Sequence, residues 1–173
     1  MHNRALIERT IRLLKKLKHL DIEISYYRHD FDWNVRDRFD KAEARVPEKS
    51  TQTEHYGLHI INYIGTAWME SMAANLPTIC FVDPKMYLFR KACIPYIEAL
   101  TSVGILHESV DSAVDLVLEI QQDPQRWWSQ DEVQDARQAF VERYARLEDS
   151  WLENWVDEFG KIAEMVESGE FLD

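Results

Sequence analysis

The strongest constraint on the fold is a short apolar segment, residues 78–82, that lies between two stretches with helical spacing. It shows no polar alternation, so it fits a strand that is buried on both faces, and Asp83 and Pro84 end it. Before it, residues 58–64 form a second β-rich apolar run, and residues 66–75 have the spacing of a helix. Strands that alternate with helices in this way predict a parallel sheet covered on both faces.

The same pattern extends to both sides of this central unit. Helical spacing is found over residues 4–20, from Met86 onward with an interruption at Pro95, over 109–122, and through a long C-terminal stretch of about 129–168. Period-two alternation at 22–27 predicts a further strand, and 105–107 predicts a short strand or turn. Residues 28–56 are polar and highly charged, and a connection of that length is functional or contains short helices. The predicted fold class is α/β, with three α/β/α layers.

Three local signals place helix starts. Pro95 fits the first turn of a second helical stretch, because proline is tolerated there. Ser109 fits an N-cap. Ser129 and Glu132 have the S-x-x-E form of a capping box.

Charge and composition exclude several classes of protein. The net charge is −11, with +3 on residues 1–50 and −14 on residues 51–173, so sequence-independent nucleic-acid binding is not expected. There is no apolar run of about 18 residues, and hence no predicted membrane span. Cys80 and Cys93 lie in apolar segments and are expected to be buried, reduced thiols. With no apolar signal core after Met1, the predicted location is the cytoplasm.

Several catalytic motifs are absent from the sequence. It contains no G-x-G-x-x-G, no G-x-x-x-x-G-K-[ST], no H-E-x-x-H and no G-x-S-x-G. The sequence therefore lacks the motifs that usually identify dinucleotide oxidoreductases, P-loop enzymes, zincin proteases and α/β-hydrolases.

The first candidate site is the junction between the 58–64 run and the helix that follows it. Gly65 ends the predicted strand, and the free N–H groups at the start of the next helix form a ready anion site at the carboxyl edge of the sheet. Thr66 would donate its hydroxyl to a phosphate, and Glu70, four residues on, would accept hydrogen bonds from sugar hydroxyls. The alternative is structural: Thr66 merely caps the helix and Glu70 favours its positive end. A reciprocal capping box would need its acid at position 69, which is Met69.

The second candidate follows the strand predicted at 22–27. Arg28 suits phosphate through its planar fork of donors, and His29 suits proton transfer or donation to phosphate. A solvated loop is the equally weighted alternative. Asp30 and Asp32 have the D-x-D form of a divalent-cation site, which is common by chance in an acidic chain, so no metal is expected.

Four segments resemble bacterial surface-carbohydrate-biosynthesis transferases. They are 26–33 (YYRHDFDW), 62–78 (NYIGTAWMESMAANLPT), 104–107 (GILH) and a stretch from Trp127 to Tyr144 that contains VQDAR at 133–137. The likeness covers most of residues 20–145 and is most specific in the second segment. The resemblance implies one Rossmann-like half of a GT-B-type glycosyltransferase, with the substrates in the cleft between two such domains.

What the resemblance implies for this chain is a donor site. Thr66 and Glu70 match the T-x-x-x-E-like pattern where the nucleotide-sugar donor sits, and such enzymes use helix ends and basic residues without a bound metal or other cofactor. The chain, residues 1–173, would then be a single domain, the incomplete C-terminal half. Its partners would be the donor and an N-terminal acceptor domain, without which it would be inactive.

The C-terminal stretch suggests a second kind of function. Trp151, Trp155, Phe159 and Ile162 form an apolar stripe in an acidic region, typical of core or interface packing. Left uncovered, the stripe predicts self-association through the C-terminal helices, or a mobile tail after about residue 148. The alternative to a glycosyltransferase domain is therefore a non-catalytic α/β interaction module that docks through these helices.

Overall fold

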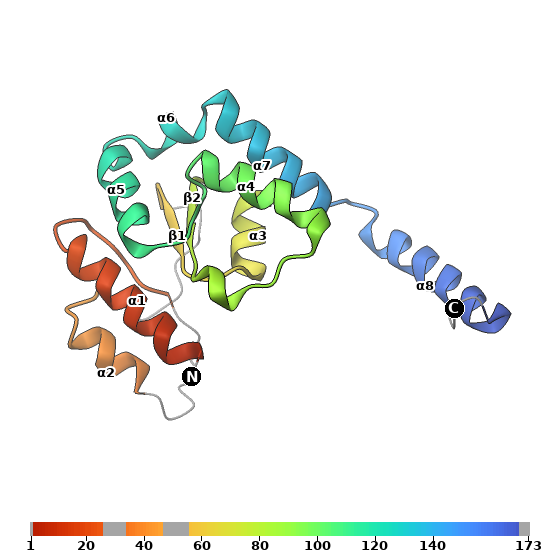
Figure 1. Ribbon diagram of the computed structural model, residues 1–173, viewed down its shortest axis with the longest axis horizontal. Coiled ribbons are helices and arrows are strands. Elements are labelled where there is room, and N and C mark those ends of the chain that lie inside the picture. The colour runs from red at the N-terminus through yellow and green to blue at the C-terminus, as the bar shows by residue number, and fades with distance from the viewer. Residues whose placement is uncertain (1, 26–33, 47–55, 170–173) are drawn as a thin grey trace.

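The computed structural model describes residues 2–25, 34–46 and 56–169 (Figure 1). Its centre is a parallel sheet of three strands in the order β1-β2-β3. The strands are β1 (His59–Ile61), β2 (Thr78–Phe81) and β3 (Leu106–His107). In the register, Ile60 lies opposite Ile79, and Cys80 lies opposite Leu106. The predicted parallel sheet is thus confirmed, with β2, which is buried along its whole length, at its centre.

Helices cover both faces of this sheet (Figure 1). On one face lie α1 (His2–Lys16) and α5 (Val110–Ile120), which contact each other. On the other face lie α3 (Thr66–Ala73) and α4 (Ile94–Ser102), with α7 (Asp131–Tyr144) packed against both. The result is the three-layer, Rossmann-like α/β/α architecture expected from the sequence.

The contact between α3 and α7 fixes the position of α3. The buried rings of Trp68 and Phe140 lie 5.0 Å apart between centroids. At the C-terminal end of α3, Arg137 Nη1 donates to the carbonyl oxygen of Met72 at 3.0 Å. Asn75 ends this helix in a left-handed conformation with φ of 55°, and its side-chain oxygen accepts from Trp128 Nε1 at 2.9 Å. A cation and an indole from α7 and the short α6 (Pro124–Trp128) thereby stabilise the end of α3.

The polar segment after α1 differs from its prediction in part. The described part of the strand expected at 22–27 makes only a single parallel bridge, between Glu23 and Arg45. The charged connection contains a short helix, α2 (Val35–Asp40), as expected of a segment of that length. A second, smaller apolar cluster forms between these parts, because Phe39 packs with residues of α1 rather than with the sheet. Its buried members are Ile7, Leu14, Ile24, Val35 and Phe39.

Two helix predictions were wrong. Over residues 84–93 the chain forms two short 3-10 turns, η2 (Pro84–Met86) and η3 (Lys91–Cys93), with irregular backbone at 87–90 between them, and the α-helix begins only at Ile94. The capping box is also absent. Gln130 is the N-cap of α7, and Ser129 instead donates its hydroxyl to the carbonyl oxygen of Gln125, at the end of α6. Ser129 lies one residue before the N-cap, so its hydroxyl is not in the position from which a side chain accepts from the first N–H groups of α7.

Other local predictions were confirmed. Pro95 lies in the first turn of α4, and Ser109 caps α5 by accepting from the Ser112 N–H at 3.1 Å. Both thiols are free. Cys80 is buried, as expected, but Cys93 is only half-buried because it sits in an irregular turn.

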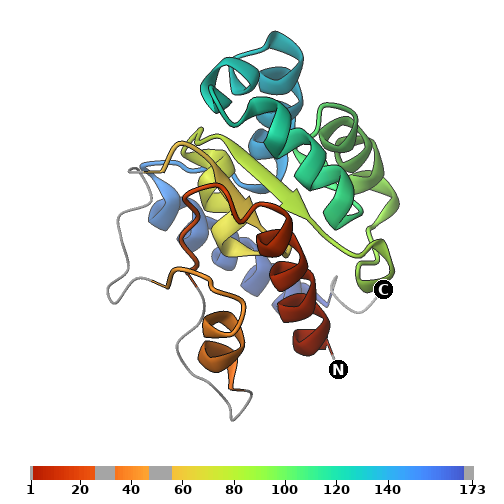
Figure 2. The same ribbon diagram turned by 90° about the vertical axis from the view of Figure 1, so that its left-hand side faces the viewer.

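The last helix, α8 (Trp151–Ser168), extends away from the rest of the molecule (Figure 1), and in the view turned by 90° it lies behind the domain (Figure 2). Every one of its residues is exposed. No helix in the described residues has both the length and the apolar composition that a membrane crossing requires.

Candidate functional site

The carboxyl ends of the three parallel strands meet at one edge of the sheet, which we call the carboxyl edge. There β1 leads through residues 62–65 into α3, β2 leads through Asp83 into η2, and β3 leads through Ser109 into α5. In open α/β sheets, ligands bind outside this edge because loops and helix N-termini converge on it. The first predicted site lies at the carboxyl edge.

The start of α3 leaves two backbone donors unused. Gly65 is the N-cap, and its carbonyl accepts from the N–H groups of Trp68 and Met69, each at 3.1 Å. Within the described residues, the N–H groups of Thr66 and Ala67 have no hydrogen-bond acceptor. Free amides at a helix N-terminus carry the positive end of its dipole and favour an anion.

Thr66 and Glu70 lie one turn apart on the exposed side of α3. Thr66 is the first helical residue and not the N-cap, and no side chain caps this helix. The part of the structural alternative in which the Thr66 hydroxyl caps α3 is therefore wrong, and the part in which Glu70 favours the positive helix end stays a prediction. Neither the Thr66 hydroxyl nor the Glu70 carboxylate has a partner within the described residues. Both groups are available to a ligand, and their separation of four residues places them on one face.

Gly65 makes room for a neighbouring ring and is not needed for its own dihedral angles. Its φ of −167° is ordinary extended backbone. A Cβ atom at this position would lie only 2.2 Å from Cε2 of Tyr63. Glycine therefore lets the half-exposed ring of Tyr63 lie directly beside the start of α3.

Neighbouring elements hold this turn in place. Tyr87, which follows η2, accepts a hydrogen bond from the Ile64 N–H at 3.0 Å. Asn62 Nδ2 donates to Thr10 Oγ1 on α1 at 2.8 Å. The turn is thus bonded to two segments that are distant in sequence, so its geometry depends on the packed domain.

Arg9 of α1 is a cation at the carboxyl edge that the sequence reasoning missed. Its guanidinium carbon lies 5.6 Å from the ring centroid of Phe81, the last residue of β2. Its Nη1 atom is buried and has no hydrogen-bond partner among the residues that the structure describes. Burial lowers the pKa of Arg9 from its ordinary value, and the nearby Asp83 carboxylate opposes this shift. The guanidinium stays charged, so a positive charge remains at this edge.

A sequence signal for Arg9 does exist. Leu6, Leu13, Leu17 and Leu20 form the apolar stripe of the first helix, and Arg9 lies on that stripe, three residues after Leu6 and four before Leu13. A charged side chain within an apolar stripe is an exception that calls for a functional explanation.

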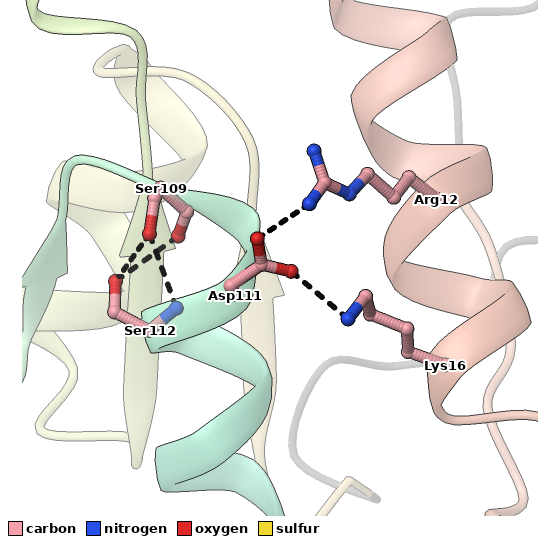
Figure 3. Close-up of polar contacts among 5 residues, drawn as sticks. All are labelled: Arg12, Lys16, Ser109, Asp111 and Ser112. Carbon is pink, nitrogen blue, oxygen red and sulfur yellow. Dashed lines mark hydrogen bonds and ion pairs between the residues drawn. The ribbon is translucent and has the colours of Figure 1, made fainter.

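The neighbouring cations of α1 have a different role. Arg12 and Lys16 both pair with the carboxylate of Asp111 at the start of α5, the latter at 3.0 Å (Figure 3). The hydrogen bond from Lys16, together with the charge of Arg12, lowers the pKa of Asp111. This cluster joins α1 to α5 and leaves Arg9 outside any ion pair in the described part of the chain.

The second predicted site cannot be placed in this geometry. Arg28, His29 and the D-x-D residues Asp30 and Asp32 all lie outside the described residues. Within the described ranges, no group of three histidine, cysteine, aspartate or glutamate side chains is arranged to hold a metal ion.

Comparison with known protein families identifies a family for this chain. A family model described as LIC12162 family transferase matches residues 4–159, which includes the whole carboxyl edge of the sheet. No curated protein and no solved structure matches the chain.

Proposed function

The chain belongs to the LIC12162 family of transferases, and we propose that it is the donor-binding domain of a glycosyltransferase. In this proposal it binds a nucleotide-sugar in the cytoplasm for transfer to a surface polysaccharide or glycolipid. The observation that carries the proposal is the start of α3, where two amides, the Thr66 hydroxyl and the Glu70 carboxylate lie together and have no partner in the described part of the chain. Amides suit a diphosphate, and a carboxylate suits the hydroxyls of a sugar.

The proposed chemistry is stabilisation of the leaving group. As the sugar departs, negative charge grows on the nucleoside diphosphate, and the amides of Thr66 and Ala67 would donate to it. Arg9 would add positive charge from the side of α1. Preorganised donors of this kind lower the barrier because they need no rearrangement during the reaction. The acceptor hydroxyl and the base that activates it are assigned to an N-terminal GT-B domain outside this sequence.

The decisive test is calorimetric titration with UDP-, CDP- and GDP-linked sugars. Glu70→Gln is expected to weaken binding by roughly 1–3 kcal/mol, the loss of a charged hydrogen bond, without a change in melting temperature. Glu119→Gln is the matched control, because Glu119 is exposed near the end of α5, away from the carboxyl edge. A large loss of stability with unchanged affinity would make Glu70 structural and contradict the proposal.

Arg9 provides a second, independent test of the anion site. Arg9→Gln is expected to weaken binding of the nucleoside diphosphate much more than binding of the nucleoside. Arg12→Gln is the control, one helical turn away and paired with Asp111 instead. Equal affinities for Arg9→Gln and the wild type would place this cation outside the site.

Arg28 and His29 are proposed for the same site on sequence grounds alone. If Arg28 meets the diphosphate, Arg28→Ala should weaken diphosphate binding, and Arg28→Lys should restore it only in part, because an ammonium cannot reproduce the bidentate fork.

A non-catalytic interaction module is the second candidate function, and one specific observation favours it. Helix α8 presents a row of large apolar side chains to solvent, which is typical of a docking surface. A folded protein that binds none of the nucleotide-sugars would support this candidate over the first.

A further inference from the structure

Helix α8 has an apolar face that no other described part of the chain covers. Eight of its large apolar side chains are between 37% and 62% exposed. They are Trp151, Leu152, Trp155, Val156, Phe159, Ile162, Met165 and Val166. A contiguous apolar surface of this kind marks an interaction site, because it is costly to leave in water.

The spacing along this face is that of a helix–helix seam. Leu152, Trp155, Phe159, Ile162 and Val166 are separated by three, four, three and four residues. This is the heptad spacing of coiled-coil core positions, which keeps one row of side chains facing a partner helix. Trp155 and Phe159 already contact each other within the row, with centroids 5.2 Å apart.

The charges of α8 permit two copies to approach. Four of its five acidic residues lie on the side opposite the seam, namely Glu153, Asp157, Glu164 and Glu167. The fifth, Glu158, is beside the seam and is paired with Lys161 at 3.1 Å. Most positions that flank the seam are apolar, and they include Trp151, Val156, Ala163 and Met165. Like charges would therefore point away from a partner α8 and not toward it.

The rest of the described chain offers no matching apolar helix face. Among the described residues, no helix other than α8 leaves more than one large apolar side chain exposed. An exposed row of apolar side chains with heptad spacing is suited to pack against a second helix that has the same spacing. We propose that α8 pairs with α8 of a second copy of this chain, so that the two apolar rows bury each other.

The experiment is sedimentation equilibrium of the full chain over a wide concentration range. We expect a reversible dimer whose dissociation constant falls as salt is added, because salt screens the net charge of −11 on each copy. Trp155→Ser with Phe159→Ser should raise the dissociation constant by about tenfold or more, as expected when central aromatic contacts are removed. Asp157→Ser with Glu164→Ser, on the opposite side of the same helix, is the matched control and should leave a dimer.

Three outcomes would overturn the proposal. A wild-type chain that is monomeric at every concentration would show that the face has a different occupant. A dimer that survives Trp155→Ser with Phe159→Ser would form through another surface. A monomeric wild type whose melting temperature falls sharply in that double variant would show that α8 packs on its own domain in solution. Thermal melts of both variants, measured beside sedimentation, separate loss of pairing from loss of folding.

Discussion

Helices α7 and α8 have similar sequence patterns and very different surroundings. Both are amphipathic helices with aromatic residues on the apolar face, and they are separated only by residues 145–150. In α7 the apolar face is covered, with Val133, Ala136 and Phe140 buried against α3 and α4. In α8 no residue is buried. Periodicity thus identifies the side of a helix that avoids water but does not identify what covers it, because the covering surface comes from elsewhere.

The difference has consequences for what each aromatic residue contributes. An aromatic ring in α7 replaces water contacts with protein contacts on folding and so stabilises the domain. A ring in α8 gains nothing from folding of the domain and gains only when a partner covers it. Substitutions of aromatic residues should therefore lower the free energy of unfolding in α7 and leave it nearly unchanged in α8.

The largest expected effect is on the covered helix. Phe140→Ala removes a buried ring that packs on Trp68 and Tyr144, and it should lower the free energy of unfolding by about 3–5 kcal/mol. Urea denaturation at low protein concentration measures this loss. Phe159→Ala on α8 is the counterpart, and an equal loss there would abolish the distinction between the two helices.

A smaller effect is expected where α7 supports the end of α3. Arg137→Gln removes a charged donor from the Met72 carbonyl and should cost about 1.5–3 kcal/mol, the range for hydrogen bonds to charged groups. Because this contact fixes α3, the variant should also weaken nucleotide-sugar binding slightly, which titration would detect. Arg126→Gln, an exposed cation on α6, is the control. If Arg137→Gln left stability unchanged, the contact between α7 and α3 would be less important than the geometry indicates.

Acidification should weaken the packed domain through His107. Burial lowers the pKa of this histidine below its ordinary value of 6.5, so the unfolded chain takes up the proton more readily than the folded one. The stability that neutral His107 provides is complete above pH 6.5 and is lost as the pH falls toward the lowered folded value. The urea concentration at the midpoint of unfolding should therefore fall as the pH is lowered from 7.5 to 5.5. In His107→Gln this midpoint should depend less on pH. Since α8 has no histidine, its pairing should not follow that dependence.

The smallest expected effect is on the exposed helix. Trp151→Ser with Trp155→Ser should change the unfolding free energy of the domain by less than about 0.5 kcal/mol and should improve solubility. The unfolding free energy should be measured at protein concentrations where the wild type is monomeric, because dimer formation stabilises a folded chain by mass action. A drop of several kcal/mol in the monomer would show that the two tryptophans pack on their own domain.

The central sheet could be predicted because its signals are local. The apolar run at 78–82, the glycine at 65 and the prolines at 77 and 95 act through backbone sterics and burial, and β2, α3 and α4 begin or end close to the expected positions. The prediction failed where two local preferences compete. Ser129 had a hydroxyl suited to the start of α7, but the same hydroxyl closes α6, and only the packed structure decides between the two.

For the candidate site, the sequence determined the residues of one element, and the tertiary structure added the others. Gly65, Thr66 and Glu70 are identified by a strand, a turn and one helical turn, all within six consecutive residues, so local periodicity is enough to group them. Tyr87 contacts the turn from 22 residues after Gly65, and Arg9 lies at the end of β2 although it comes 56 residues before Gly65. No local pattern in the sequence contains this packing arrangement. The covering of α7 and the exposure of α8 were decided in the same way. Apolar contacts extend over only a few ångströms and do not specify a partner. The surface that covers an apolar face is therefore determined by the fold of the whole molecule.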